Sequence, residues 1–266
     1  MDGRTLRTSL HEGRLALGSL VVSPSPRWLG AISGSGLDFV FIDTEHIPLD
    51  RHQLSWMCLG YAARGLAPIV RIPAPDPYQA AMAVDAGAHG VVAPYIEHPD
   101  QIRALVGAVK HRPLKGERLA GILAGREPVT AELAAYLDGF NPNAVVIANI
   151  ESLPAMARLP ELCTVPGLDA ALIGPHDLSV QLGMPEAWDD PRFLDAVRTI
   201  LRTARDAGIG AGIHHWVGVE RMREYVAWGA NLLIDHGDVS LVAEQLRRRA
   251  AAIRGSAVAA TAGEAV

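Results

Sequence analysis

Residues 39–50 read FVFIDTEHIPLD and open with an uninterrupted apolar run of aromatic and β-branched side chains. A run without polar alternation is typical of a parallel strand that is covered on both faces. Seven further runs of this kind lie at residues 15–22, 68–72, 90–96, 144–152, 170–175, 210–216 and 231–237. Eight such strands favour a closed barrel over an open sheet.

The segments between these runs have the signals of capped helices. DPYQAAMAVDAGA (76–88) and DPRFLDAVRTILRTARDAG (190–208) begin with Asp-Pro and end near a glycine. In AGAHG, DAGIG and WGANL a glycine stands where a helix turns back into a strand. The repeated unit is therefore βα and predicts an α/β protein, a (β/α)8 TIM barrel. A doubly wound sheet is the alternative, but no GxGxxG follows the first run.

The domain prediction is one barrel domain over residues 1–254. An insertion is expected at about 111–142, with 111–128 as a loop and 129–140 as a helix. Residues 255–266, GSAVAATAGEAV, have low complexity and predict a flexible tail.

Composition excludes several classes of protein. The 266 residues have a formal net charge of -5, which provides no basic surface for nucleic acid. No apolar run is long enough to span a membrane, and the start MDGRTLRTSLHEG lacks the apolar core of a secretory signal. We therefore expect a cytoplasmic protein. Cys58 and Cys163 form no CxxC pair, and we expect both to be buried structural residues.

Polar side chains follow most of the predicted strands. In a (β/α)8 barrel the active site lies at the carboxyl ends of the strands, so these side chains would share one mouth. They are Asp43, Glu45 and His46 after the second strand, Arg71 after the third, Glu151 after the fifth, Asp177 after the sixth, His214 and His215 in the seventh, and Asp235, His236 and Asp238 after the eighth.

Taken singly, each residue also has a structural interpretation. Asp43 suits a helix cap or a partner for loop amides. Arg71 suits an ion pair with a neighbouring carboxylate, Asp177 the N-cap of the helix that follows, and Glu151 a surface acid.

Taken together, the same residues favour chemistry. Carboxylates at the ends of adjacent strands can hold one hard cation such as Mg²⁺ or Mn²⁺. An imidazole titrates near neutral pH, so His46 can act as acid or base beside that cation. Arg71 offers a fork of donors for a carboxylate or an enolate. The set describes carbanion chemistry next to a carbonyl group.

A series of motifs in this chain resembles a known family. The motifs are LDFVFIDTEH (37–46), IVRIPAPDP (69–77), VDAGAHGVVAPYIEHPDQ (84–101), IANIES (147–152) and VPGLDAALIGPHDLSVQLG (165–183). They look like the successive signatures of the HpcH/HpaI aldolases, the metal-dependent class II pyruvate aldolases, over residues 15–250. The resemblance implies a (β/α)8 barrel and a homo-oligomer, a trimer or hexamer, whose last helix is exchanged between neighbours.

The resemblance also implies an activity and roles for residues. The activity is reversible cleavage of a 4-hydroxy-2-oxo acid to pyruvate, or a similar 2-oxo acid, and an aldehyde through a metal-stabilised enolate. Glu151 and Asp177 would bind Mg²⁺, Mn²⁺ or Co²⁺, His46 would be the acid/base residue with Asp85 as its partner, and Arg71 would stabilise the enolate. Asp43, Glu45, Pro175 and His176 are expected to support the site or contact substrate without binding the metal.

Some features depart from the family pattern. Leu119 replaces the second glycine of a Pro-x-Gly-x-Arg-Gly run that shapes the substrate pocket in the family, and His176 stands where a small or amide residue is usual. His214, His215 and His236 are interpreted either as binding an anionic substrate or a second metal, or as core and solvated histidines. The two lysines, Lys110 and Lys115, lie in the predicted insertion region, which disfavours a Schiff-base mechanism.

Two alternatives remain at this point. One is a lyase or decarboxylase that uses the same metal-enolate site on another 2-oxo acid. The other is a non-catalytic barrel that binds a ligand, although such a protein has no need of His46 as an acid/base residue.

Overall fold

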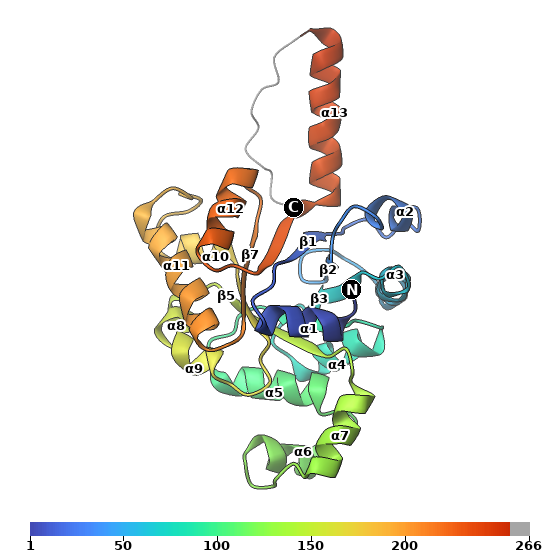
Figure 1. Cartoon of the computed structure of the whole chain (residues 1–266), viewed down its shortest axis with the longest axis vertical. Coiled ribbons are helices and arrows are strands. Elements are labelled where there is room, and N and C mark those ends of the chain that lie inside the picture. Colours follow the sequence, from blue (N-terminus) through green and yellow to red (C-terminus); the bar gives the residue numbers. More distant parts are fainter. Residues whose placement is uncertain (256–266) are drawn as a thin grey trace.

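The computed structural model describes residues 1–255 and shows a closed barrel of eight parallel strands in the order β1 to β8 (Figure 1). The fold prediction is therefore confirmed. The strands are β1 Ala16–Leu20, β2 Phe39–Asp43, β3 Ala67–Arg71, β4 Gly90–Ala93, β5 Val145–Ile150, β6 Ala170–Ile173, β7 Gly210–His215 and β8 Leu232–Gly237. Seven of the predicted runs contain one of these strands, and the run at 68–72 overlaps β3, which begins one residue earlier. The prediction for the tail concerns residues that, from 256 on, lie outside the described part.

Helices surround the barrel and connect its strands (Figure 1). They are α1 Gly3–His11, α2 Trp28–Ile32, α3 Arg51–Ala63, α4 Pro77–Asp85, α5 Pro99–Lys110, α6 Gly116–Leu123, α7 Ala131–Phe140, α8 Leu153–Ala157, α9 Leu159–Cys163, α10 Pro175–Gln181, α11 Pro191–Asp206, α12 Val219–Ala227 and α13 Asp238–Arg254.

The two helix starts predicted at Asp-Pro pairs are confirmed, and in each the aspartate is the N-cap. Asp76 accepts a hydrogen bond from the backbone N–H of Tyr78, and Asp190 accepts one from Arg192. In both helices a proline fills the first position, where a missing N–H costs nothing. Gly87 follows α4 with φ +103°, a conformation that disfavours residues with a Cβ.

The apolar core has two parts. Inward-facing side chains such as Phe41, Ile69 and Leu172 fill the barrel, and a larger cluster lies between the strands and the surrounding helices. Cys58 and Cys163 are both buried free thiols, as expected. Among residues 1–255 no helix has the length and apolar character needed to cross a bilayer.

Two helices escaped the sequence prediction. α1 places Leu6 and Leu10 against the inner cluster of the barrel, and the pattern of apolar runs does not predict this helix. Residues 111–128 were predicted as a loop, but they contain α6. Leu119 and Leu123, four residues apart, pack against α5 at Gly107, which has no Cβ to block them. The predicted helix at 129–140 is present as α7.

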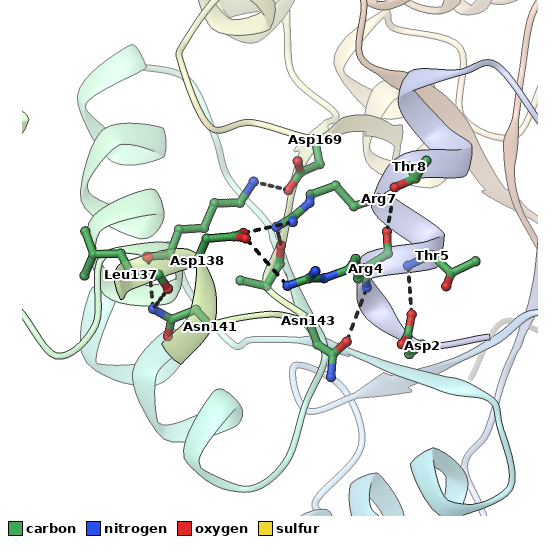
Figure 2. A network of polar contacts seen from close by, with 12 residues as sticks. Asp2, Arg4, Thr5, Arg7, Thr8, Leu137, Asp138, Asn141, Asn143 and Asp169 are labelled. Atoms are coloured by element: carbon green, nitrogen blue, oxygen red, sulfur yellow. Dashed lines mark hydrogen bonds and ion pairs between the residues drawn. The ribbon is translucent and has the colours of Figure 1, made fainter. Parts of the chain in front are cut away.

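Polar residues tie α1 and α7 to the amino-terminal end of the barrel (Figure 2). The buried carboxylate of Asp169 accepts the backbone N–H of Val146 at 2.8 Å and lies 2.6 Å from Lys110 Nζ. Burial lowers the pKa of Lys110, and the charge of Asp169 opposes this shift. Asp138 pairs with Arg4 and Arg7 at 3.5 and 3.4 Å, but it is well exposed.

The two pairs predict different costs of mutation. We expect Asp169→Asn to lower the free energy of unfolding by about 3–5 kcal/mol, because the buried ammonium of Lys110 loses its counter-charge. The matched change Asp138→Asn should cost less than about 1 kcal/mol, since it weakens exposed pairs. Urea unfolding measures both. Equal losses would show that the Asp169 pair is no more important than the surface pair.

Candidate active site

A cavity of about 350 Å³ opens at the carboxyl ends of the strands. It is the expected place for a site in this fold. Seven residues named from the sequence line it, and five others complete its wall. The lining residues are His46, Arg71, Glu151, Pro175, His176, Asp177 and His214, together with Phe41, Asn149, Leu172, Gly174 and Trp216.

A buried ion pair joins the ends of β2 and β3. Arg71 Nε and Nη2 donate to Asp43 Oδ1 and Oδ2 at 2.8 and 2.6 Å. Burial alone would raise the pKa of Asp43, but the hydrogen bonds and charge of Arg71 hold it below its ordinary value. Asp43 also accepts the backbone N–H of Glu45 at 2.9 Å. Asp43 thus holds both the loop and Arg71, and the structural interpretations of these two residues are correct as far as they go.

Glu45 lies between three other groups of the mouth. Its Oε2 is 3.2 Å from Arg71 Nε and 3.8 Å from His46 Nε2, and its Oε1 accepts the hydroxyl of Tyr95 at 2.6 Å. This hydrogen bond raises the pKa of Tyr95 to about 12. The side chain of His46 is 52% exposed and lines the cavity, so it can meet a ligand while a carboxylate stands behind it.

Glu151 is a buried acid and not a surface one. Its Oε1 accepts the backbone N–H of Tyr95 at 2.8 Å, and its Oε2 accepts the side-chain amide of Asn149. Burial raises the pKa of Glu151 to about 7; the Tyr95 N–H opposes the shift, and the charges of Asp177 and Glu45 add to it. The carboxylate therefore lies in a place that favours either a proton or a cation.

Asp177 approaches the same cavity from the first turn of α10. Gly174 is the N-cap of this helix, so the N-cap interpretation of Asp177 is wrong. Gly174 also makes room for Glu151, because a Cβ at this position would collide with its side chain. His176 precedes Asp177 in α10. Its Nδ1 lies 3.4 Å from Glu186 Oε1, and its ring contacts that of Trp188 edge-on, with centroids 5.1 Å apart.

These residues fit a divalent cation. Glu151 and Asp177 are hard oxygen donors that line one cavity. Among the described residues, Arg71 is the strong positive charge that contacts the neighbouring acids Asp43 and Glu45. Asn149 Oδ1 is buried there without a hydrogen-bond partner. Within residues 1–255 no three His, Cys, Asp or Glu side chains enclose a metal site by themselves. Two carboxylates are a usual protein share for Mg²⁺ where substrate and water complete the shell.

The histidines of β7 and β8 lie in different environments. His214 lines the cavity, whereas His215 points away from it and donates to or accepts from Tyr225 at 2.9 Å. His236 lies 2.7 Å from Asp235 and stacks on Trp216 at 6.4 Å, and the Asp235 hydrogen bond raises its pKa. They do not form one cluster around the mouth.

Asp85 lies apart from the other named residues in this chain. It is the last residue of α4, where that helix returns to the amino-terminal end of β4, and it pairs with Arg112. His46 follows β2 at the opposite end of the barrel. The structure records no contact between these two side chains among the described residues, so the proposed partnership is not formed within one chain.

Sequence reasoning missed three residues of the mouth. Asn149 lies on β5 and Glu151 directly follows that strand, and their spacing of two places both on the inner face. Trp216 lies two positions after His214 on the same principle. For Tyr95 the sequence contains no comparable signal, because its role follows from a backbone with φ +54° two residues after β4.

Comparisons with known proteins agree with the barrel fold and indicate a family. A family model described as HpcH/HpaI aldolase/citrate lyase matches residues 18–243. A hydroxypyruvate/pyruvate aldolase of Deinococcus radiodurans is 31% identical over 251 residues, 94% of this chain and 90% of that protein. A 2-keto-3-deoxy-L-rhamnonate aldolase of Escherichia coli is 28% identical, covering 91% of this chain and 90% of the relative. The crystal structure of a HpcH/HpaI aldolase/citrate lyase family protein from Burkholderia cenocepacia superposes with a TM-score of 0.81 at 26% identity, covering 94% and 99% of the two chains.

The position of Glu151 predicts an unusual titration. In metal-free protein we expect its carboxyl group to titrate with a pKa near 7, so that it is mostly protonated at pH 6 and ionised at pH 8. Infrared difference spectra against Glu151→Gln would isolate its band. Asp177→Asn should lower this pKa, because it removes a like charge. Titration of Glu151 near 4.5 in both proteins would contradict the description of the site.

Proposed function

The chain belongs to the HpcH/HpaI aldolase/citrate lyase family, and we propose that it is a divalent-metal-dependent aldolase, a carbon–carbon lyase. Its reaction is the reversible cleavage of a 4-hydroxy-2-oxo acid to pyruvate, or a similar 2-oxo acid, and an aldehyde. The relatives named above are aldolases that act on small oxo acids, which supports this reaction class. The protein's location in the cytoplasm stays a prediction from its sequence.

One observation carries the proposal. Glu151, Asp177, Arg71 and His46 come from four different parts of the chain and line one cavity. A binding protein for an oxo acid could use the first three, but an exposed imidazole beside them adds an acid/base group that binding alone does not require. The convergence therefore favours catalysis over a ligand-binding barrel.

We propose Glu151 and Asp177 as the metal ligands. A divalent cation between these carboxylates would polarise the carboxylate and ketone oxygens of the 2-oxo acid. Mg²⁺ and Mn²⁺ suit oxygen donors, and Co²⁺ is a further candidate. Asn149 and the Tyr95 N–H hold Glu151 in place from the protein side.

Arg71 is proposed to stabilise the charge that develops on the ketone oxygen. Its Nε and Nη2 are occupied by Asp43, so the guanidinium plane cannot rotate freely and Nη1 remains available to a ligand. A donor that is fixed before the reaction costs no reorganisation when the charge appears. Asp43 contributes by orienting Arg71 and not by touching the substrate.

His46 is proposed as the acid/base residue. In the cleavage direction the imidazole accepts the proton of the C4 hydroxyl, the C3–C4 bond breaks, and the aldehyde leaves with its new carbonyl group. The bonding electron pair moves towards the ketone oxygen, and a proton delivered to C3 completes pyruvate. Glu45 Oε2 lies 3.8 Å from His46 Nε2, and Glu45 is proposed to help orient the ring. Pro175 and His176 line the wall beside Asp177, where they are proposed to contact the substrate.

We further propose a homo-oligomer, a trimer or a hexamer, in which α13 packs on a neighbouring subunit. Figure 1 shows this helix projecting from the barrel, and Asp238 is its one buried residue. Its exposed apolar side chains need a covering surface. They are Val239, Leu241, Val242, Leu246 and Ile253. The first residue of α13 is anchored to the barrel, because the Asp238 carboxylate accepts the backbone N–H groups of Val22 and Ser23 at 3.0 Å each.

The metal proposal predicts that removal of the metal abolishes activity and that changes at its ligands weaken metal binding. We expect EDTA-treated protein to lose aldol addition of pyruvate to a panel of aldehydes, and Mg²⁺, Mn²⁺ or Co²⁺ to restore it. Glu151→Gln and Asp177→Asn should each weaken Mn²⁺ binding at least tenfold in calorimetry, because half of the protein's charged ligands are lost. Glu186→Gln, a nearby exposed acid, is the control. Unchanged affinity in both ligand variants would reject these ligands, and oxaloacetate decarboxylation without aldol addition would favour a decarboxylase.

The separation of Asp85 from His46 predicts that any partnership crosses a subunit boundary. His46→Asn and Asp85→Asn should then each lower kcat by about 10²-fold, within the range for loss of acid/base assistance. Mixed and reassembled subunits of the two variants should regain activity, because some sites combine an intact His46 with an intact Asp85. If Asp85→Asn alone keeps full activity, Asp85 serves only its ion pair with Arg112.

A further inference from the structure

The two adjacent histidines of β7 face opposite sides of the strand. His215 contacts Trp188 and Tyr225 outside the barrel, whereas His214 faces inward and lines the cavity. The ring of His214 lies 5.1 Å from the ring of Phe41, a member of the inner barrel cluster. Trp216 is the next inward-facing residue towards the mouth. His214 therefore stands at the deep end of the cavity, beside the otherwise apolar side chains of Phe41 and Leu172.

A single hydrogen bond determines where His214 carries its proton. Trp216 Nε1 lies 3.0 Å from His214 Nε2. An indole nitrogen is only a donor, so His214 Nε2 must be the acceptor and must lack a proton. Trp216 is itself held in place, because it stacks on the ring of His236 and packs against the inner barrel cluster. In the neutral imidazole the proton then resides on Nδ1.

His214 stays neutral over the ordinary pH range. Burial lowers its pKa to about 3, and the nearby charge of Arg71 lowers it further. With its Nε2 lone pair engaged by Trp216 and its Nδ1 protonated, His214 has no free lone pair for a cation. A second metal at this histidine, considered from the sequence, is therefore disfavoured.

The Nδ1–H of His214 lacks a partner. No hydrogen bond joins it to any of residues 1–255, and unlike His215 Nε2 it is not among the sealed, unpartnered atoms of the core. A donor that is open to a cavity loses hydration when a ligand fills that cavity, and this loss is unfavourable unless the ligand supplies an acceptor. The ligand of this cavity should thus have an oxygen facing His214.

The position of His214 indicates which oxygen this is. The aldehyde must enter and leave while the 2-oxo acid is bound, so the 2-oxo acid occupies the deep end. Its carboxylate and ketone oxygens are used at Glu151, Asp177 and Arg71 under the proposed function, on which this inference rests. The remaining carbon is C3, and in pyruvate it would place a methyl group against an N–H donor.

We infer that His214 is a specificity-determining residue, whose Nδ1–H donates a hydrogen bond to an oxygen on C3 of the 2-oxo acid. The preferred substrate class is therefore a 2-oxo acid with a hydroxyl group on C3, and unsubstituted pyruvate is the poorer donor. Sites that pair a buried donor with a substrate oxygen discriminate strongly against analogues without that oxygen.

Steady-state kinetics with two donors test this inference. Hydroxypyruvate and pyruvate are each added to propanal, which has no oxygen besides its carbonyl, in the presence of Mn²⁺. In the unmodified enzyme kcat/KM should favour hydroxypyruvate. His214→Leu should reduce the ratio of the two kcat/KM values at least tenfold, through the hydroxypyruvate value alone. His214→Gln, which keeps an N–H donor, should recover part of the ratio.

The control is His52→Gln, which changes an exposed histidine on the first turn of α3 and should leave the ratio unchanged. An unchanged ratio in His214→Leu would overturn the inference. So would a loss that follows the aldehyde, seen when glycolaldehyde replaces propanal, because His214 would then contact the acceptor. If the unmodified enzyme forms no adduct with either donor, the proposed function itself fails.

Nitrogen NMR of the unmodified enzyme provides a test that does not depend on variants. The His214 signal, identified by its absence in His214→Leu, should show the Nδ1–H tautomer without titrating between pH 5.5 and 8.5. Hydroxypyruvate should shift its Nδ1 resonance more than pyruvate does. A His214 signal that titrates in this range, or that shifts equally with both acids, would contradict the inference.

Discussion

The bidentate pair between Arg71 and Asp43 is the interaction on which the organisation of the mouth depends. It joins the carboxyl ends of β2 and β3 at 2.6 and 2.8 Å in a nearly buried position. A guanidinium held in this way cannot turn freely, and Arg71 lines the cavity where a ligand would bind. The same Asp43 accepts the N–H of Glu45 and so determines where the loop that presents His46 begins. One ion pair therefore orients the anion-stabilising group and the acid/base group together.

The charges of the mouth are balanced around Arg71 but not around Glu151 and Asp177. Asp43 and Glu45 are matched by Arg71, but Glu151 and Asp177 have no cation in contact among the described residues. It is unfavourable to bury the negative charge of Glu151 beside that of Asp177. The raised pKa of Glu151 reflects this unfavourable free energy. Asn149 and the Tyr95 N–H offset part of the cost with hydrogen bonds to both carboxylate oxygens. The remaining charge is what a divalent cation would neutralise, which links the electrostatics of the folded chain to the proposed chemistry.

The sequence predicted the repeated strands of the barrel and the polar residues that follow them. Runs of apolar residues identify β1 to β8, because a strand covered on both faces excludes polar residues along its whole length. The same reasoning placed His46, Arg71, Glu151 and Asp177 at one mouth. It failed where tertiary contacts decide the outcome: α6 depends on leucines that pack against Gly107, and Tyr95 depends on a backbone turn. Asp85 came from the family resemblance alone, and one chain does not bring it to His46.

The paired histidines of β7 show why residue type is weak evidence without an environment. His214 and His215 are adjacent and both keep a lowered pKa through burial, yet their available atoms differ. His215 has Nε2 sealed in the core beside aromatic rings, where no ligand can reach it. His214 has Nδ1 open to the cavity and its tautomer determined by Trp216. A count of histidines near the mouth suggested a charged or metal-binding cluster. Alternation along one strand, together with one donor-only indole, leaves His214 as the member of this pair with a neutral donor at the cavity, and we infer an oxygen of the substrate as its partner.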